Sequence, residues 1–135
     1  MTQIAGVDLG EYHSVTDVFL EACDKYAQKP AFSCMGQTLS FTEMERLTAN
    51  FASYLQNHTD LMIGDRIAIQ LPNVLQFPIA VFGAMRAGMV VVNTNPLYTV
   101  REMEHQFNDS GAKALLILAN MASLAEQVVP KTGIK

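Results

Sequence analysis

Gly83 and Gly88 have the spacing of the two glycines in a phosphate-binding loop, G-x-x-x-x-G. That loop requires a lysine directly after the second glycine, because its ammonium group contacts the terminal phosphates. Met89 occupies the lysine position, and the glycines flank the end of a predicted helix, whereas a phosphate loop would open one. The pattern therefore favours helix packing. The chain also contains no GxGxxG fingerprint of a dinucleotide site.

Glu102 and His105 lie three residues apart on one predicted helix, a spacing that di-iron bundles use twice. Only one copy occurs here, and a parallel-sheet protein is the wrong scaffold for such a centre. His13 and His58 fall in other elements, and the chain has no GxSxG elbow that would present a serine nucleophile. We therefore predict no metal site and no catalytic residue in this chain, and structural or solvated roles for its histidines.

Cys23 and Cys34 are too few and wrongly spaced for a zinc site or a CxxC redox pair. Cys23 falls on the apolar stripe of a predicted helix, which indicates a buried free thiol and fits a reducing cytoplasm. Half of the 135 residues are hydrophobic and the net charge is −4, which is typical of a soluble globular α/β protein. The basic residues form no stripe, so nucleic acid is not an expected partner.

The first residues, MTQIAGVDLGEYHS, lack the basic and apolar segments of a secretory signal. The uncharged stretch from Ile67 to Met85 raises the question of a membrane span, which needs about 20 mainly apolar residues. Polar residues and prolines interrupt this stretch, so we interpret it as a strand, a turn and a helix. The interruptions are Gln70, Pro72, Asn73, Gln76 and Pro78.

Two helices with a short extended region between them are predicted for the first half of the chain. Ser14 caps the first helix, and Pro30 blocks its continuation. The segment AFSCM indicates a strand, followed by a turn at Gly36 and further extended residues. Ser40 and Glu43 form a capping box at the head of the second helix. The predicted inner faces are Val15, Val18, Phe19, Ala22, Cys23 and Tyr26, and then Phe41, Met44, Leu47, Phe51, Tyr54 and Leu55.

From Gly64 onward a strand followed by a helix occurs three times, which indicates a mostly parallel sheet with helices on its faces. The strands RIAIQL, MVVVN and KALLIL are apolar enough to be buried on both faces. The helix after the first strand starts either at an Asn73 cap or near Pro78, and it ends at Gly88.

Thr99 and Glu102 form a second capping box, at the head of the next helix, and Gly111 ends that helix. A last helix runs from Asn120 to about Val129. The inner stripe of the capped helix is Val100, Met103 and Phe107.

We divide the chain into a leader (1–13), a lead-in of helices and strands (14–63) and the repeated strand–helix units (64–135). The chain ends with VVPKTGIK, just after a helix, where another strand is expected. We therefore interpret 1–135 as an incomplete α/β domain.

The run from Gly64 to Leu118 strongly resembles the N-terminal region of the adenylate-forming enzymes: acyl-CoA synthetases, peptide-synthetase adenylation domains and luciferases. The resemblance extends upstream through LSFTEMERLTANFASYL and is weakest before Ser14 and after Met121. Peptide-synthetase domains usually carry D-P-x-Y-P-x-E-R in the loop where this chain has NPLYTVRE, which is most similar to bacterial long-chain fatty-acid–CoA ligases. The shared pattern is Arg86-Ala87-Gly88, Asn95-Pro96, Arg101-Glu102 and Asp109-Ser110-Gly111-Ala112.

This resemblance implies the N-terminal subdomain of the adenylate-forming fold and a two-step reaction. A fatty-acid carboxylate attacks the α-phosphate of Mg-ATP, which gives acyl-adenylate and pyrophosphate, and the CoA thiol then displaces AMP. ATP, Mg²⁺ and CoA are thus implied for the parent enzyme. The family's phosphate loop, Mg²⁺ ligand, ribose-binding aspartate and catalytic lysine have no counterpart in this sequence, so the chain alone is expected to be inactive and to hold no cofactor by a motif of its own.

Four residues are candidates for lining the acyl or CoA channel of the parent enzyme: Asn95, Tyr98, Thr99 and His105. The reason is that ligands favour the carboxyl ends of parallel strands. Turn geometry and helix capping also account for the three loop residues and are the favoured explanation, and a structural role is favoured for His105.

Two other interpretations stay open. The chain could be a stand-alone module that binds acyl groups, CoA or a partner protein, or a fragment of an aryl or medium-chain acid–CoA ligase. The expected partners are the rest of its own chain, fatty acid and CoA, and an exposed apolar surface would also allow self-association. The expected location is the cytoplasm. Peripheral contact with the inner membrane stays open, although no basic amphipathic helix is visible.

Overall fold

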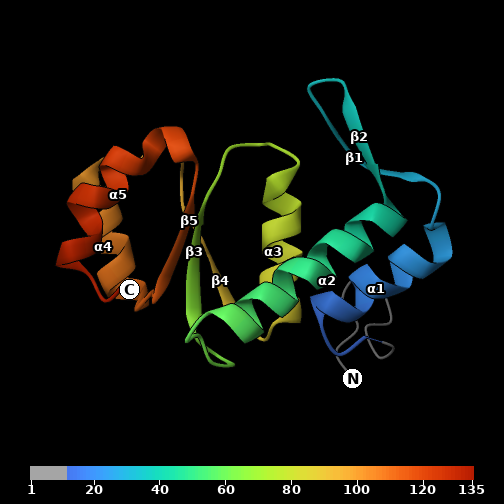
Figure 1. Cartoon of the computed structure of the whole chain (residues 1–135), viewed down its shortest axis with the longest axis horizontal. Helices are drawn as coiled ribbons and strands as arrows, with labels where there is room; N and C mark the ends of the chain where they lie inside the picture. Colours follow the sequence, from blue (N-terminus) through green and yellow to red (C-terminus); the bar gives the residue numbers. More distant parts are fainter. Residues whose placement is uncertain (1–11) are drawn as a thin grey trace, which may run out of the picture.

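The computed structural model describes residues 12–135, which form three layers (Figure 1). Helices α2 (Phe41–His58) and α3 (Gln76–Arg86) cover one face of a parallel sheet. Helices α4 (Val100–Ser110) and α5 (Ala122–Val128) cover the other face. The expected mostly parallel sheet with helices on both faces is confirmed.

The sheet consists of β3 (Arg66–Gln70), β4 (Val90–Asn93) and β5 (Ala114–Ile117) in the order β4-β3-β5. All pairs are parallel, and the central strand β3 is almost completely buried. The prediction that the other two strands are buried on both faces is wrong. Each has only one hydrogen-bonded neighbour in the described part of the chain, so β4 leaves Val90 47% exposed and β5 is half-buried along its whole length.

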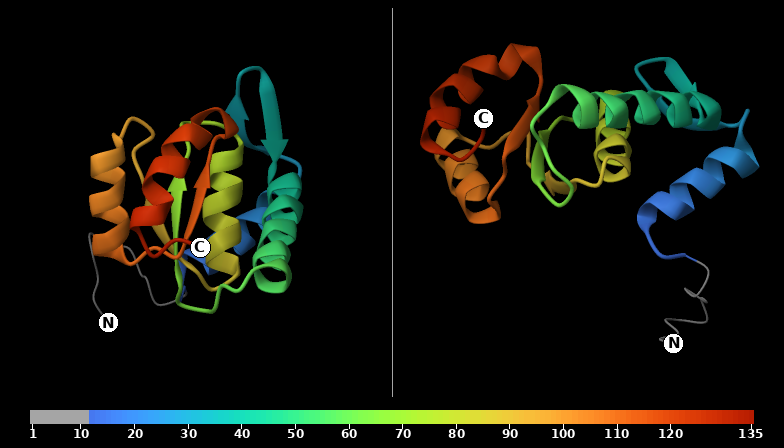
Figure 2. Two further views of the ribbon diagram at one scale, coloured as in Figure 1. Left: turned by 60° about the vertical axis from the view of Figure 1, so that its left-hand side comes forward. Right: turned by 60° about the horizontal axis from the view of Figure 1, so that its bottom comes forward.

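The lead-in consists of helix α1 (Val15–Tyr26) and an antiparallel hairpin of β1 (Pro30–Cys34) and β2 (Gln37–Ser40). The hairpin turn passes through Met35 and Gly36, which have φ angles of 50° and 79°. Figures 1 and 2 show the hairpin projecting beyond the helices, on the side of the molecule away from α4 and α5.

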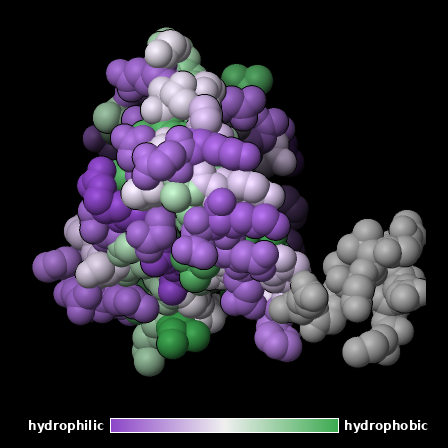
Figure 3. Space-filling view, turned by 90° about the vertical axis from the view of Figure 1, so that its right-hand side faces the viewer, coloured by the Kyte–Doolittle hydropathy of each residue, from purple (hydrophilic) through white to green (hydrophobic). Residues whose placement is uncertain are grey.

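Helix α1 buries a narrower stripe than its sequence predicts. Phe19 and Cys23 are buried, and the Phe19 ring is stacked on Phe82 of α3 with centroids 4.2 Å apart. Val15, Val18 and Tyr26 are exposed, because α1 contacts the molecule along one side only. The surface at this end of the molecule is mainly polar, with apolar side chains in small separate patches (Figure 3).

Both predicted capping boxes are present, at the starts of α2 and α4. Gly111 ends α4 in the left-handed conformation, with φ 66°. Helix α3 begins at Gln76, which lies between the two predicted starts, and Asn73 does not cap it. Pro78 is therefore the third residue of the helix, where a missing N–H costs little because the first turn has no internal acceptors.

The predicted last helix is built from three pieces. They are a 3-10 turn (Ala119–Met121), α5 and a second 3-10 turn (Val129–Lys131). The chain then turns back toward the start of β5, where the C-terminus lies (Figure 1).

Candidate functional site

The loop between β4 and α4 contains three of the four predicted channel residues. Its turn is fixed by Asn95, whose side-chain Oδ1 accepts from Leu97 N (2.9 Å) and whose carbonyl oxygen accepts from Tyr98 N (3.1 Å). The Leu97 side chain is 88% exposed. The loop is thus a tight turn that presents an apolar side chain outward, at the carboxyl end of β4.

Thr99 caps helix α4 and is joined to Glu102 by a reciprocal set of hydrogen bonds. Glu102 N donates to Thr99 Oγ1 (3.4 Å), and Thr99 N and Oγ1 donate to Glu102 Oε2 at 2.8 and 2.7 Å. These bonds stabilise the ionised carboxylate and so lower the pKa of Glu102. The bond from the backbone N–H has the larger effect, and the bond from the hydroxyl has the smaller one. The hydroxyl of Thr99 is therefore engaged in the helix start.

Tyr98 and His105 have different surroundings. Tyr98 is half-buried and packs against the apolar core between the sheet and helices α4 and α5. His105 is exposed on α4. The structure therefore brings Asn95, Tyr98 and Thr99 together in one loop and leaves His105 on the solvent side of the following helix.

Two glutamines that the sequence did not single out as site residues hold this loop. The Gln70 amide, at the end of β3, donates to the Asn95 carbonyl (3.1 Å), and the Gln106 amide of α4 donates to the Asn93 carbonyl (3.1 Å). Gln70 is fully buried, and the Oε1 atoms of both glutamines are buried without a protein partner in the described part of the chain. The signal that could have identified Gln70 is its position as a polar residue near the end of the apolar run RIAIQL.

Nothing in this loop supplies a nucleophile with a base beside it. Among residues 12–135, no cluster of three or more histidine, cysteine, aspartate or glutamate side chains is close enough to hold a metal ion. The hydroxyl of Thr99 and the carboxylate of Glu102 already bond each other.

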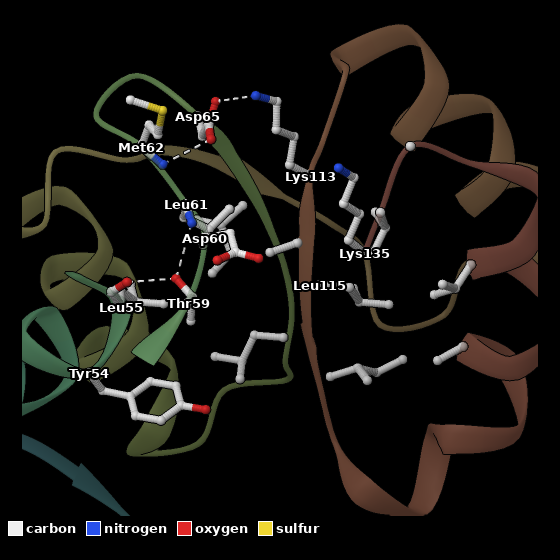
Figure 4. A pocket seen from close by; sticks show the side chains of 18 of the residues that line it. Tyr54, Leu55, Thr59, Asp60, Leu61, Met62, Asp65, Lys113, Leu115 and Lys135 are labelled. Atoms are coloured by element: carbon white, nitrogen blue, oxygen red, sulfur yellow. Dashed lines mark hydrogen bonds and ion pairs between the residues drawn. The ribbon is translucent and has the colours of Figure 1, made fainter. Parts of the chain in front are cut away.

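A second feature is a groove of about 730 Å³ beside β5, which we call the β5 groove (Figure 4). Its wall includes Tyr54 and Leu55 of α2 and Leu116 of β5. A polar pair lies at its rim, where Lys113 Nζ is 2.6 Å from Asp65 Oδ1. This hydrogen bond, helped by Met62 N, lowers the pKa of Asp65.

Three residues that carry the family resemblance have structural roles in this chain: Arg86, Ala87 and Gly88. Arg86 of α3 donates to the Glu45 carbonyl (2.8 Å) and to Thr48 Oγ1 (2.9 Å), and it forms an ion pair with the Glu45 carboxylate at 3.0 Å. Ala87 is buried, and Gly88 has a φ of 83°, a conformation that suits glycine. Arg86 thus ties the C-terminal end of α3 to α2.

Gly83 is a packing residue. A Cβ at this position would lie 2.8 Å from Phe51 Cδ1 and 3.1 Å from the Thr48 carbonyl oxygen. Only glycine allows α2 and α3 to approach this closely, which supports the packing interpretation of the glycine pair.

Both thiols are free, and their surroundings differ. Cys23 is buried, and this burial, reinforced by the Glu45 carboxylate and opposed by Arg86, raises the pKa of its thiol. Cys34 is half-buried beside an apolar cavity of about 400 Å³, and its Sγ donates to the Asn73 carbonyl oxygen at 3.2 Å. The predicted buried free thiol at Cys23 is confirmed.

An α/β layer with an exposed loop at the carboxyl end of its sheet is common to many classes of protein, and the family comparison identifies the class. The model described as "AMP-binding enzyme" matches residues 19–134, so the chain belongs to this family. A curated long-chain-fatty-acid–CoA ligase of Salmonella typhimurium is 48% identical over 97% of this chain, and one of Escherichia coli is 50% identical over 92%. The chain spans only 23% and 22% of those two proteins.

Solved structures share the fold. A long-chain-fatty-acid–CoA ligase from Archaeoglobus fulgidus superposes with a TM-score of 0.80 at 24% identity, over 88% of this chain and 25% of that one. A benzoate–CoA ligase from Burkholderia xenovorans gives 0.81 at 22% identity, over 89% and 24%. The expected adenylate-forming fold is confirmed.

No helix within residues 12–135 combines the length and the apolar composition that crossing a membrane requires.

Proposed function

We propose that this chain is part of an AMP-forming long-chain fatty-acid–CoA ligase. The observation that carries the proposal is the 48% identity to a long-chain-fatty-acid–CoA ligase over 131 residues, almost the whole chain. The parent enzyme would activate a fatty acid with ATP and Mg²⁺ to the acyl-adenylate and transfer the acyl group to CoA. The proposal places it in the cytoplasm, with or without peripheral contact with the inner membrane.

Within that enzyme this segment acts as scaffold. The shared Arg86-Ala87-Gly88 pattern and the capping box at Thr99 support this role, because each is engaged in helix contacts or helix starts. The groups that bind the triphosphate, Mg²⁺ and CoA belong to the rest of the ligase. Asn95, Tyr98 and Thr99 would line its substrate channel from one side, while His105 lies on the exposed face of α4.

The experiment is a thioester assay of the full-length protein that carries this segment, with ATP, Mg²⁺, CoA and three acids: oleate, octanoate and benzoate. We expect kcat/KM to be highest for oleate by about tenfold or more, since each buried CH₂ contributes about 0.8 kcal/mol. A preference for benzoate or octanoate would contradict the proposed substrate class and would still support the proposed enzyme class.

Absence of thioester with every acid, from a protein that still binds oleate, would favour the stand-alone binding module.

The Leu97→Ala variant of the full-length protein tests whether the loop between β4 and α4 lines the substrate channel. Its side chain points to solvent in this chain, so unchanged kinetics mean that this part of the loop does not line the channel, and a raised KM for oleate alone means that it does.

A further inference from the structure

The loop between β4 and α4 is tied to other elements at each of its first three residues. The Gln106 amide of α4 donates to the Asn93 carbonyl oxygen (3.1 Å). Thr94 N donates to a carbonyl oxygen of β3 (3.0 Å). The Gln70 amide of β3 donates to the Asn95 carbonyl oxygen (3.1 Å). Two glutamine side chains and one backbone bond therefore fix the position of this loop relative to the sheet.

Gln70 and Gln106 reach the loop from the same face of the sheet. Ala68 and Gln70 lie two residues apart on β3, so their side chains point to one face. Ala68 packs on that face with Phe107 of α4, and Gln106 is the residue before Phe107. We call Gln70 and Gln106 together the glutamine clamp, because their two amides hold the loop from the α4 side.

Packing alone does not require an amide at Gln70. The side chain is fully buried, and an unbranched apolar side chain such as methionine would fill similar space. Within residues 12–135, the side-chain polar atoms that are buried without a protein partner are the Oε1 atoms of Gln70 and Gln106. A buried acceptor without a donor costs free energy. What the Gln70 amide supplies, and methionine would not, is the bond to the Asn95 carbonyl oxygen.

We propose that Gln70 and Gln106 are positioning residues for the ligase reaction, and that they act by holding the loop between β4 and α4 in its place beside the substrate channel. The inference rests on the proposed function, because the channel belongs to the full-length ligase. Without the Gln70 bond, the Asn95 carbonyl oxygen keeps its bond from Tyr98 N (3.1 Å). That bond lies inside the turn, so it does not hold the turn against the sheet.

The Gln70→Met variant of the full-length ligase removes the amide and keeps the packing. We expect the KM for oleate or for CoA to rise about fivefold, because one hydrogen bond of ordinary strength corresponds to about that factor in an equilibrium constant. The KM for ATP should be unchanged, since the proposal places the triphosphate-binding groups outside this segment. The midpoint of urea unfolding should be unchanged or higher, because the substitution also removes a buried acceptor.

Two more variants complete this comparison. Gln106→Leu removes the other bond of the glutamine clamp at a half-buried position and should raise the same KM. Gln127→Met is the matched control. Gln127 is exposed on α5, and its amide donates to the Ser123 carbonyl oxygen (2.9 Å) within the same helix, so all three KM values should be unchanged.

Hydrogen–deuterium exchange of the peptide over residues 93–99 reports on the loop without depending on activity. We expect this peptide to exchange about fivefold faster in both clamp variants and at an unchanged rate in Gln127→Met, because the loop opens more easily once one of its bonds to other elements is lost.

Unchanged KM values for oleate and CoA in both clamp variants would overturn the proposal. So would equal rises in all three KM values together with a lower urea midpoint, because a purely structural role predicts that pattern. The two claims fail in different ways. An active ligase whose loop exchange is the same in all variants contradicts only the glutamine clamp. A protein that makes no thioester, but whose loop exchange responds to the clamp variants, contradicts the proposed function and supports the hold of the clamp on the loop.

Discussion

Two parts of one sheet face differ in how completely this chain covers them. Above β3, helices α2 and α3 pack closely enough to exclude any side chain at Gly83, and Ile69 beneath them is fully buried. Above β5, the next strand, the same face is open, and Leu116 lines a groove of about 730 Å³. Ile69 and Leu116 are register partners, so the difference comes from the covering layer and from the position of β5 beside a single neighbouring strand in the described chain. Within the described residues one part of the face is covered, whereas the other is open.

The largest expected effect compares these two register partners. Ile69→Ala should lower the free energy of unfolding of this chain by about 2–5 kcal/mol, because the cavity forms in a close-packed layer. Leu116→Ala should cost less than half of that, because solvent reaches the side chain already. Urea unfolding of both variants measures the difference. Equal losses would mean that the β5 groove is as tightly packed as the covered part.

An intermediate effect is expected from filling the closest contact between α2 and α3. Gly83→Ala should destabilise the chain by about 1–3 kcal/mol, since the new methyl group would lie 2.8 Å from Phe51 Cδ1. Gly133→Ala is the matched control on the open side. Its methyl group would meet only ordinary van der Waals contact, at 3.9 Å, so its midpoint in thermal unfolding should be unchanged.

Helix starts should have similar energies on both sides of the sheet, because their hydrogen bonds are local. Ser40→Ala at α2 and Thr99→Ala at α4 should each cost about 1 kcal/mol in urea unfolding. Ser123→Ala, exposed in α5, should be neutral. If Ser40→Ala lowers the free energy of unfolding and Thr99→Ala does not, the two regions differ in local helix stability as well as in coverage.

The smallest effect is a change in pH dependence. The bonds from Thr99 lower the pKa of Glu102 in the folded chain, so the stability they provide is complete above the ordinary value of 4.5 and is lost as the pH falls through the folded value. Glu102→Gln should therefore flatten the fall in stability below pH 4.5. Glu126→Gln, exposed in α5, should leave that slope unchanged when the two are compared by thermal unfolding from pH 3 to 6.

Local signals made most of the fold predictable. The capping boxes at Ser40 and Thr99, and Gly111 after α4, set helix ends through bonds within a few residues of each other, and the structure has them where the sequence placed them. The strand order was beyond such signals. The composition of MVVVN predicts an inner strand, yet within residues 12–135 this strand pairs only with β3.

The surroundings of the candidate site were less predictable, because they depend on contacts between distant residues. Thr99 was expected to cap and does so, whereas Gln70 was missed because its partner at Asn95 lies 25 residues away. The narrow inner stripe of α1 has the same origin. Its periodicity marks Val15, Val18 and Phe19 as inner positions, but packing against α2 and α3 covers Phe19 and leaves both valines exposed.

We propose that this chain is the scaffold of a ligase whose catalytic groups lie elsewhere. ATP–pyrophosphate exchange by the 135-residue chain, with Mg²⁺ and oleate, tests it most directly. We expect exchange at background level, with and without oleate. Oleate-dependent exchange above background would mean that residues within this chain activate the carboxylate, and it would contradict the account.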